Sequence, residues 1–180
     1  MDITYLGAGS VKLSGKNLNI ITDPLVAGKA DVVTISGPST VEGKDWPIAE
    51  NALRIDQPGE YEVKGAMISG VPAQLHIDEE GYRGTAYSIL IDGVNVVVAG
   101  NISGKINEDQ VEKLGQVDVL IVPVGGNGLT LDAEGAAAVA ARFVLEVAGR
   151  QPADEIPHGE GRASRALLEE ARTTLAGALG

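Results

Sequence analysis

The sequence predicts an α/β (α+β) fold in which β-sheets are covered by helices. Short runs of alternating apolar and polar residues, separated by glycine-containing turns, fill the first hundred residues. From residue 107 onwards, segments with helical periodicity alternate with apolar segments typical of strands. Strands followed by alternating helix and strand favour layered sheets with helices on the outside.

The first strands can be placed from local patterns. Residues 3–6, 11–13 and 17–22 predict a short antiparallel meander. Residues 31–36 form a β-branched run that ends in Gly37 and Pro38. Such a run is typical of a buried strand that delivers a loop to the edge of a sheet, where α/β proteins often place ligands.

Two turn motifs predict hairpins. Pro58-Gly59 suits a type II turn, so we expect residues 53–56 to pair with residues 61–64. Asp92-Gly93 lies between two apolar runs and predicts a second hairpin, because this dipeptide favours the tight turn that such a pair needs.

The second half of the chain predicts helices with clear ends. Asn107 and Gln110 form a capping-box pattern at the start of a helix that Gly115 ends. Residues 117–124 are a nearly continuous apolar run, typical of a strand covered on both faces. Asp132 is expected to cap a second helix.

We expect that second helix to end near Arg142 and residues 143–147 to form a final strand. The expected domain covers residues 1–180 as one unit. Within it, residues 151–180 would be a polar linker followed by an amphipathic helix at residues 163–179.

Composition excludes several classes of function. The chain has 180 residues and a formal net charge of −11, without a basic cluster, so we expect no binding to nucleic acid or to a membrane surface. It contains no cysteine, which excludes disulfides and thiolate metal sites. We find no basic leader and no apolar run near the roughly 18 residues of a membrane span, and we expect a cytoplasmic protein.

Residues that carry catalysis are scarce. The only histidines are His76 and His158, and the sequence has no Gly-x-Ser-x-Gly motif that would indicate a serine nucleophile. Asp23 stands directly before a proline, which favours a turn-capping role for its carboxylate. We therefore expect no catalytic residue.

Five blocks, in this order along residues 2–142, resemble the small metallo-β-lactamase-fold hydrolases of prokaryotes. The blocks are Thr4–Ser10 (TYLGAGS), Ile21–Pro24 (ITDP), Ala30–Ser36 (ADVVTIS), Pro58–Gly65 (PGEYEVKG) and Asp118–Gly126 (DVLIVPVGG). The resemblance implies a four-layer αββα sandwich. It also implies a zinc site at one edge of the two facing sheets, where a metal-bound hydroxide attacks an ester, amide or phosphodiester.

The chain departs from the family where the metal ligands are expected. Zinc hydrolases need three or more His or carboxylate ligands around an open position. Ala8 and the Gly37–Glu42 segment stand where relatives place histidines, and Asn101 stands where relatives have the metal-bridging aspartate. The resemblance leaves His76, Asp23, Asn101 and His158 as vestigial ligand candidates, and places Ala8, Gly37, Ser39 and Asn127 along the cleft.

Three functions remain open at this level. The first is a non-catalytic protein that has lost zinc and is kept for binding or structure. The second is a zinc-dependent hydrolase with a remodelled site built from the four vestigial candidates. The third is an acidic interaction module, in which the C-terminal helix or an exposed apolar patch joins subunits or a protein partner.

Overall fold

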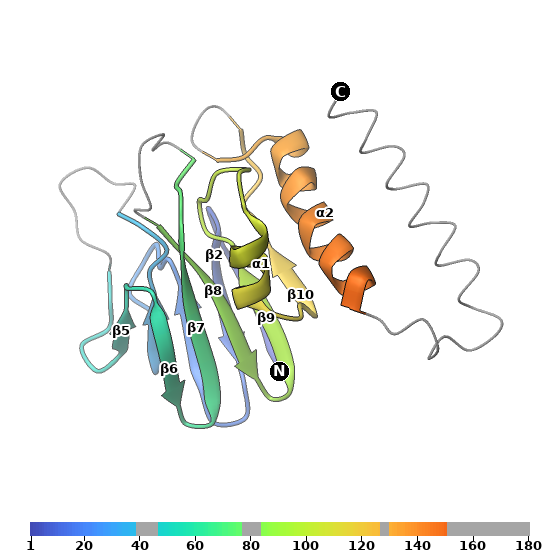
Figure 1. Cartoon of the computed structure of the whole chain (residues 1–180). Helices are drawn as coiled ribbons and strands as arrows, with labels where there is room; N and C mark the ends of the chain where they lie inside the picture. Colours follow the sequence, from blue (N-terminus) through green and yellow to red (C-terminus); the bar gives the residue numbers. More distant parts are fainter. Residues whose placement is uncertain (39–46, 77–83, 127–129, 151–180) are drawn as a thin grey trace. The chain divides into compact units, whose positions relative to one another are not determined.

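The computed structural model describes residues 1–38, 47–76, 84–126 and 130–150, the last six of these by their backbone alone. Residues Met1–Phe143 form one compact unit and Val144–Gly180 a second. The first unit is built on two five-stranded β-sheets (Figure 1). No helix in the described part of the chain is long and apolar enough to cross a membrane.

The first sheet contains strands from the N-terminal third of the chain. Its strands, hydrogen-bonded in this order, are β1 (Asp2–Gly7), β2 (Ser10–Ser14), β3 (Asn19–Thr22), β4 (Val32–Thr34) and β5 (Leu53–Ile55). β1 to β3 form the predicted antiparallel meander, whereas β4 runs parallel to both β3 and β5. The buried strand predicted at residues 31–36 is present inside this sheet, but β4 covers only Val32–Thr34 and the chain leaves the strand two residues before Ser36 ends the run.

The second sheet has the order β10-β9-β8-β7-β6. Its strands are β6 (Gly59–Val63), β7 (Ala66–Ala73), β8 (Gly84–Ile91), β9 (Val94–Val98) and β10 (Val119–Ile121). The β8–β9 hairpin turns at Asp92 (φ 53°) and Gly93 (φ 81°), as predicted. Two successive positive φ angles are the requirement that makes Asp-Gly suitable there.

The hydrophobic core lies between the two sheets. Alternate residues of β2, β3 and β4 pack against alternate residues of β7, β8 and β9, since side chains in a strand point to the two faces in turn. Its fully buried members include Leu13, Ile20, Val32, Ile68, Ile89 and Val96. Burial of this apolar surface holds the two sheets face to face.

Two helices cover the outer face of the second sheet. Helix α1 (Glu108–Leu114) contributes Val111 and Leu114, and helix α2 (Ala133–Arg150) contributes Val139 and Phe143, to a second apolar cluster with β7, β8 and β9. The capping box is confirmed, because the Asn107 side chain accepts from the Gln110 N–H and the Gln110 side chain accepts from the Asn107 N–H. Gly115 ends α1 as predicted.

These layers confirm the predicted fold class. The described residues supply two facing sheets and the helical layer on the second of them. β10 contributes to both apolar clusters, as expected of the apolar run at residues 117–124, although its assigned strand covers only three residues. The predicted helix at residues 163–179 lies outside the described residues.

Two predictions of secondary structure are wrong. Residues 53–56 and 61–64 do not form a hairpin, because β5 pairs with β4 in the first sheet while β6 pairs with β7 in the second. The turn at Pro58 carries the chain from one sheet to the other, and a turn motif alone does not specify which strands pair. Residues 143–147 are not a strand, since they continue α2 and Phe143 is buried four residues after Val139.

Candidate functional site

The candidate site lies at the end of the sandwich where β3, β4, β7 and β9 finish, called here the loop end. Two backbone hydrogen bonds fix this end: one joins β8 to the segment after β4 in the other sheet, and one joins the segments that follow β7 and β9 of the second sheet. The N–H of Thr85 donates to the Ser36 carbonyl (2.8 Å), and the N–H of His76 donates to the Asn101 carbonyl (3.0 Å). The sequence therefore brings His76 and Asn101 together through their main chains.

Asp23 and Ser36 form the polar centre of the loop end. The Asp23 carboxylate accepts the Ser36 N–H (2.7 Å) with Oδ1 and the Ser36 hydroxyl (2.5 Å) with Oδ2. Asp23 also has φ 42°, and its own N–H donates to the Thr34 carbonyl (2.9 Å). Burial raises the pKa of the Asp23 carboxyl, and the two Ser36 hydrogen bonds act in the opposite direction.

Gly100 brings the second sheet against this pair. Its φ is 62°, and a Cβ atom added to it would lie 2.4 Å from Ser36 Cβ, closer than any side chain allows. Only glycine fits this approach without displacement, because it has no Cβ and tolerates positive φ. Ser36 thus lies between Asp23, in the segment after β3 of the first sheet, and Gly100, in the segment after β9 of the second sheet.

Two buried oxygens at this end have no hydrogen-bond partner in the described part of the chain. They are Oδ1 of Asn101 and Oγ1 of Thr34, the last residue of β4. Buried polar atoms are usually paired, so an unpaired one needs a specific explanation, such as a ligand or water. Asn101 is the more relevant of the two, because it adjoins Gly100 and His76.

Of the residues predicted to line the cleft, the structure places Gly37 at the loop end beside Ser36, whereas Ala8 lies in another loop. Gly37 follows Ser36 directly, and a Cβ on it would lie 3.2 Å from Leu75, beside His76. Ala8 belongs to a different loop, in which a Cβ added to Gly7 would lie 3.4 Å from Leu25 and one added to Gly9 would lie 3.5 Å from Pro123. Ser39, Asn127 and His158 lie outside the described residues.

The described donor atoms do not fit a hydrolytic zinc site. Both oxygens of Asp23 already accept from Ser36, Asn101 offers a neutral amide, and His76 is a single imidazole. No group of three or more His, Cys, Asp or Glu side chains that could hold a metal occurs within the described ranges. Zinc that activates water generally has three such protein ligands.

Sequence reasoning missed Ser36 and Gly100 as parts of this site. Ser36 is the polar residue that ends the largely apolar segment at residues 32–36, and that break was the available signal. Its pairing with Asp23 spans 13 positions and could not be deduced from a local pattern. The need for glycine at position 100 arises from the contact with Ser36, which is visible only in three dimensions.

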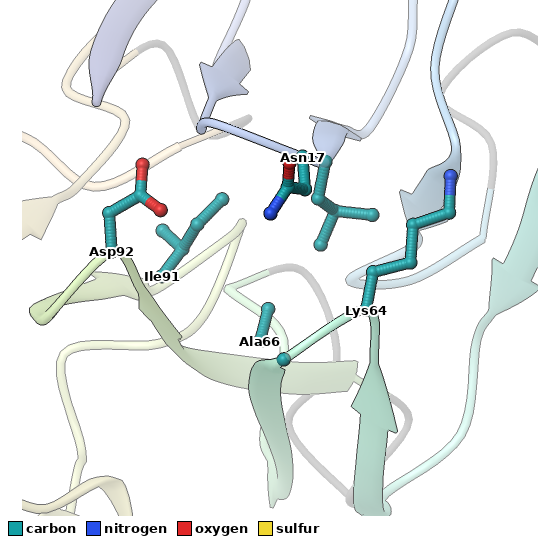
Figure 2. A pocket seen from close by; sticks show the side chains of 7 residues that line it. Asn17, Lys64, Ala66, Ile91 and Asp92 are labelled. Atoms are coloured by element: carbon teal, nitrogen blue, oxygen red, sulfur yellow. The ribbon is translucent and has the colours of Figure 1, made fainter.

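A small hollow occurs at the opposite end of the sandwich, between the turns that join β2 to β3, β6 to β7 and β8 to β9. Figure 2 shows the side chains that line it, among them Asn17, Lys64 and Asp92. Its volume of ≈ 30 Å³ holds a water molecule or two, not a substrate. The charged side chains that line the hollow are already paired with protein groups. Lys64 Nζ donates to Asp31 Oδ1 (2.6 Å), and Asp92 Oδ2 accepts the Lys16 N–H (3.0 Å).

Two facing five-stranded sheets, with helices on an outer face and polar loops at one end, define the sandwich class of metallo-β-lactamase-fold proteins. A family model described as a beta-lactamase superfamily domain matches residues 2–148. The chain belongs to this superfamily, in its metallo-β-lactamase branch. The comparison with curated proteins found no match.

Solved structures support the same assignment. A protein from Thermotoga maritima, named as a Zn-dependent hydrolase of the metallo-β-lactamase superfamily, is 31% identical with a TM-score of 0.63, over 79% of this chain and 70% of that chain. A protein from Parabacteroides distasonis, named as a metal-dependent hydrolase, is 23% identical with a TM-score of 0.59, over 78% and 76% of the two chains. A metallo hydrolase from Ignicoccus hospitalis is 17% identical with a TM-score of 0.56, over 78% and 77%. The last two support the fold alone.

Proposed function

We propose that this chain is a non-catalytic member of the metallo-β-lactamase superfamily, kept in the cytoplasm for binding or for a structural role. The observation that carries the proposal is the Asp23–Ser36 pair. A carboxylate that could have served a metal accepts two hydrogen bonds from one serine, at 2.7 and 2.5 Å. It acts there as a connector between β3 and the segment after β4.

The substitutions around this pair support the same conclusion. Asn101 stands where the family resemblance places a metal-bridging aspartate, and its neutral amide supplies no negative charge. Ala8 and Gly37 have no ligating side chain. Bridging of two metals requires an anionic group, and activation of water requires several strong ligands around one metal.

One observation favours the alternative, a metal-dependent hydrolase with a remodelled site. The buried Oδ1 of Asn101 has no partner among the described residues, and Asn101 is joined through its backbone carbonyl to His76. A cation or a polar ligand beside Asn101 would satisfy this oxygen. A single amide and a single imidazole nevertheless provide less anionic character than hydrolytic zinc sites use.

Metal analysis separates the two functions. We expect full-length protein, purified without chelator, to contain far less than one zinc or iron per chain. We also expect the metal content of His76→Ala to equal that of the wild type. Stoichiometric metal that disappears in His76→Ala would refute the non-catalytic proposal.

A substrate screen gives an independent test of the same proposal. Phosphodiester, lactone and thioester substrates are incubated with the wild type and with His76→Ala, in added Zn²⁺ or Mn²⁺ and in chelator. We expect no turnover above the protein-free rate in any condition. Turnover that requires metal and is lost in His76→Ala would establish the remodelled hydrolase.

A further inference from the structure

Within the first unit, strand β1 is an edge strand whose apolar side chains are not covered by any of the described residues. Ile3 and Tyr5 pair across the sheet with Leu13 and Val11 of β2, and paired residues share one face of a sheet. Leu13 and Val11 are 0% and 3% exposed, because they lie in the core between the sheets. Ile3 and Tyr5 are 41% and 71% exposed. The described residues that bury this face of the sheet at β2 therefore do not extend over β1.

In the part of the chain that the structure describes, the free edge of β1 also lacks the usual protection against pairing with another strand. Exposed edges are normally kept short, or carry charges, proline or a bulge, which prevent pairing with another chain. β1 has six residues and one charge, at Asp2, and its irregularity lies only at its end, between Tyr5 and Gly7. Among the described strands, the opposite edge β5 has three residues, and β6 carries Glu60 and Glu62.

We propose that β1 is a dimer interface, at which β1 of a second copy of the chain adds in antiparallel orientation with the register centred on Thr4. This register places Ile3 of each copy opposite Tyr5 of the other. A pair of an aromatic and a β-branched side chain is among the favourable cross-strand pairs. The two five-stranded sheets then form one continuous sheet through backbone hydrogen bonds.

Symmetry favours a second copy over an unrelated partner, and the charge carried by β1 itself does not oppose this contact. Antiparallel pairing of two identical strands has a two-fold axis, so one contact closes the assembly and uses both free edges. The chain carries a net charge of −11, but β1 contributes only Asp2 to the contact. In this register the two Asp2 residues lie about 13 Å apart along the strands, beyond the Debye length of about 8 Å at physiological salt.

An engineered cysteine tests the register directly. The sequence contains no cysteine, so Thr4→Cys introduces a single thiol at the exposed centre of β1. Directly opposed residues in antiparallel strands have Cα atoms about 4.5–5.5 Å apart, which is within the range of a disulfide. We expect mild oxidation to convert Thr4→Cys into a covalent dimer on a non-reducing gel.

The matched control places the thiol on the other edge of the same sheet. Arg54→Cys lies at the exposed centre of β5, and we expect it to stay monomeric on the same gel. Equal rates of cross-linking in Thr4→Cys and Arg54→Cys would overturn the proposal, because they would indicate random collisions.

Light scattering after size exclusion provides the second measurement. We expect the full-length wild type to have twice the 18.5 kDa mass of the chain and Tyr5→Lys to have the mass of one chain. Leu53→Lys, at 48% exposure on β5, is the control that should remain dimeric. A circular dichroism spectrum equal to that of the wild type shows that Tyr5→Lys is folded. A monomeric wild type at millimolar concentration, or a Tyr5→Lys dimer, would refute the interface, and neither result depends on the metal content.

Discussion

The carboxylate of Asp23 accepts both the backbone N–H and the hydroxyl of Ser36, at 2.7 and 2.5 Å. This double contact joins the end of β3 to the segment after β4, next to the point where Gly100 of the second sheet approaches Ser36. The polar centre of the loop end therefore has a structural task in this chain, and its energetic contribution can be measured.

Asp23→Ala is expected to lower the free energy of unfolding by about 1–3 kcal/mol, because it leaves the partly buried Ser36 N–H and hydroxyl without their acceptor. Asp23→Asn is the matched control. Its amide can accept the Ser36 N–H and donate to the Ser36 hydroxyl, and asparagine suits the φ of 42° at this position. We expect Asp23→Asn to stay within about 1 kcal/mol of the wild type in urea unfolding. Equal losses in both variants would contradict the role given to this pair.

Asp23 also predicts a pH dependence of stability. Burial raises the pKa of its carboxyl in the folded state, so the folded protein holds this proton more tightly than the unfolded chain does. The protonated Asp23 carboxyl contributes its full stability below the pKa that it has in the unfolded chain. This contribution is lost as the pH rises through the higher pKa that it has in the folded protein.

The pH effect is measured as a difference between two proteins. Unfolding free energies of the wild type and Asp23→Asn are compared between about pH 4 and pH 8. We expect the wild type to lose stability relative to Asp23→Asn as the pH rises. The comparison cancels Asp31, whose pKa is lowered by the hydrogen bond from Lys64 and whose effect has the opposite sign. A difference that does not vary with pH would contradict this prediction.

Features that depend on neighbouring residues could be predicted from the sequence. The Asp92-Gly93 turn needs two positive φ angles, and the α1 capping box needs two side chains three positions apart. Both are set by local geometry, so the residue types were sufficient evidence. The opening meander and the ends of α1 were correct for the same reason.

Features that depend on distant contacts could not be predicted in this way. The segment at residues 53–64 has the pattern of a hairpin, but the core between the sheets takes Ile55 into the first sheet while β6 joins the second. Phe143 to Val147 has strand-like residues, but Phe143 packs with Val139 on one face of α2. In both places tertiary packing outweighs local preference.

The candidate site could likewise be predicted only in part. Resemblance to known blocks of sequence pointed to Asp23, Asn101 and His76, and the structure joins the last two through the His76 N–H and the Asn101 carbonyl. The contact between Asp23 and Ser36 was not predicted, because the Asp23-Pro24 pair indicated only a local turn cap. The residue type at each position is visible in the sequence, whereas the hydrogen-bond partner of the Asp23 carboxylate is visible only in the fold.

Gly100→Ala is expected to destabilise the protein by about 2–4 kcal/mol. The added methyl group would lie 2.4 Å from Ser36 Cβ, and φ at this position is 62°, so the variant combines a clash with backbone strain. Gly93→Ala separates the two costs, because its φ is 81° and a Cβ there meets nothing within 4 Å. We expect Gly93→Ala to lose only about 1–2 kcal/mol in thermal or urea unfolding. A Gly93→Ala loss as large as that of Gly100→Ala would show that the approach to Ser36 is not tight.

Tyr87→Phe tests the polar link between the two sheets. The buried Tyr87 hydroxyl, on β8, donates to the carbonyls of Ile35 (2.9 Å) and Ile55 (3.1 Å). Ile35 follows β4, and Ile55 is the last residue of β5, so both acceptors belong to the side of the first sheet. Its removal leaves these carbonyls without that donor and is expected to cost about 1–2 kcal/mol of unfolding free energy. Tyr61→Phe is the control, since its hydroxyl donates to the Gln57 carbonyl (3.0 Å) in an exposed contact where water can replace it. We expect Tyr61→Phe to change stability by less than about 0.5 kcal/mol. If the two variants lose the same stability, the Tyr87 hydroxyl does not hold the sheets together.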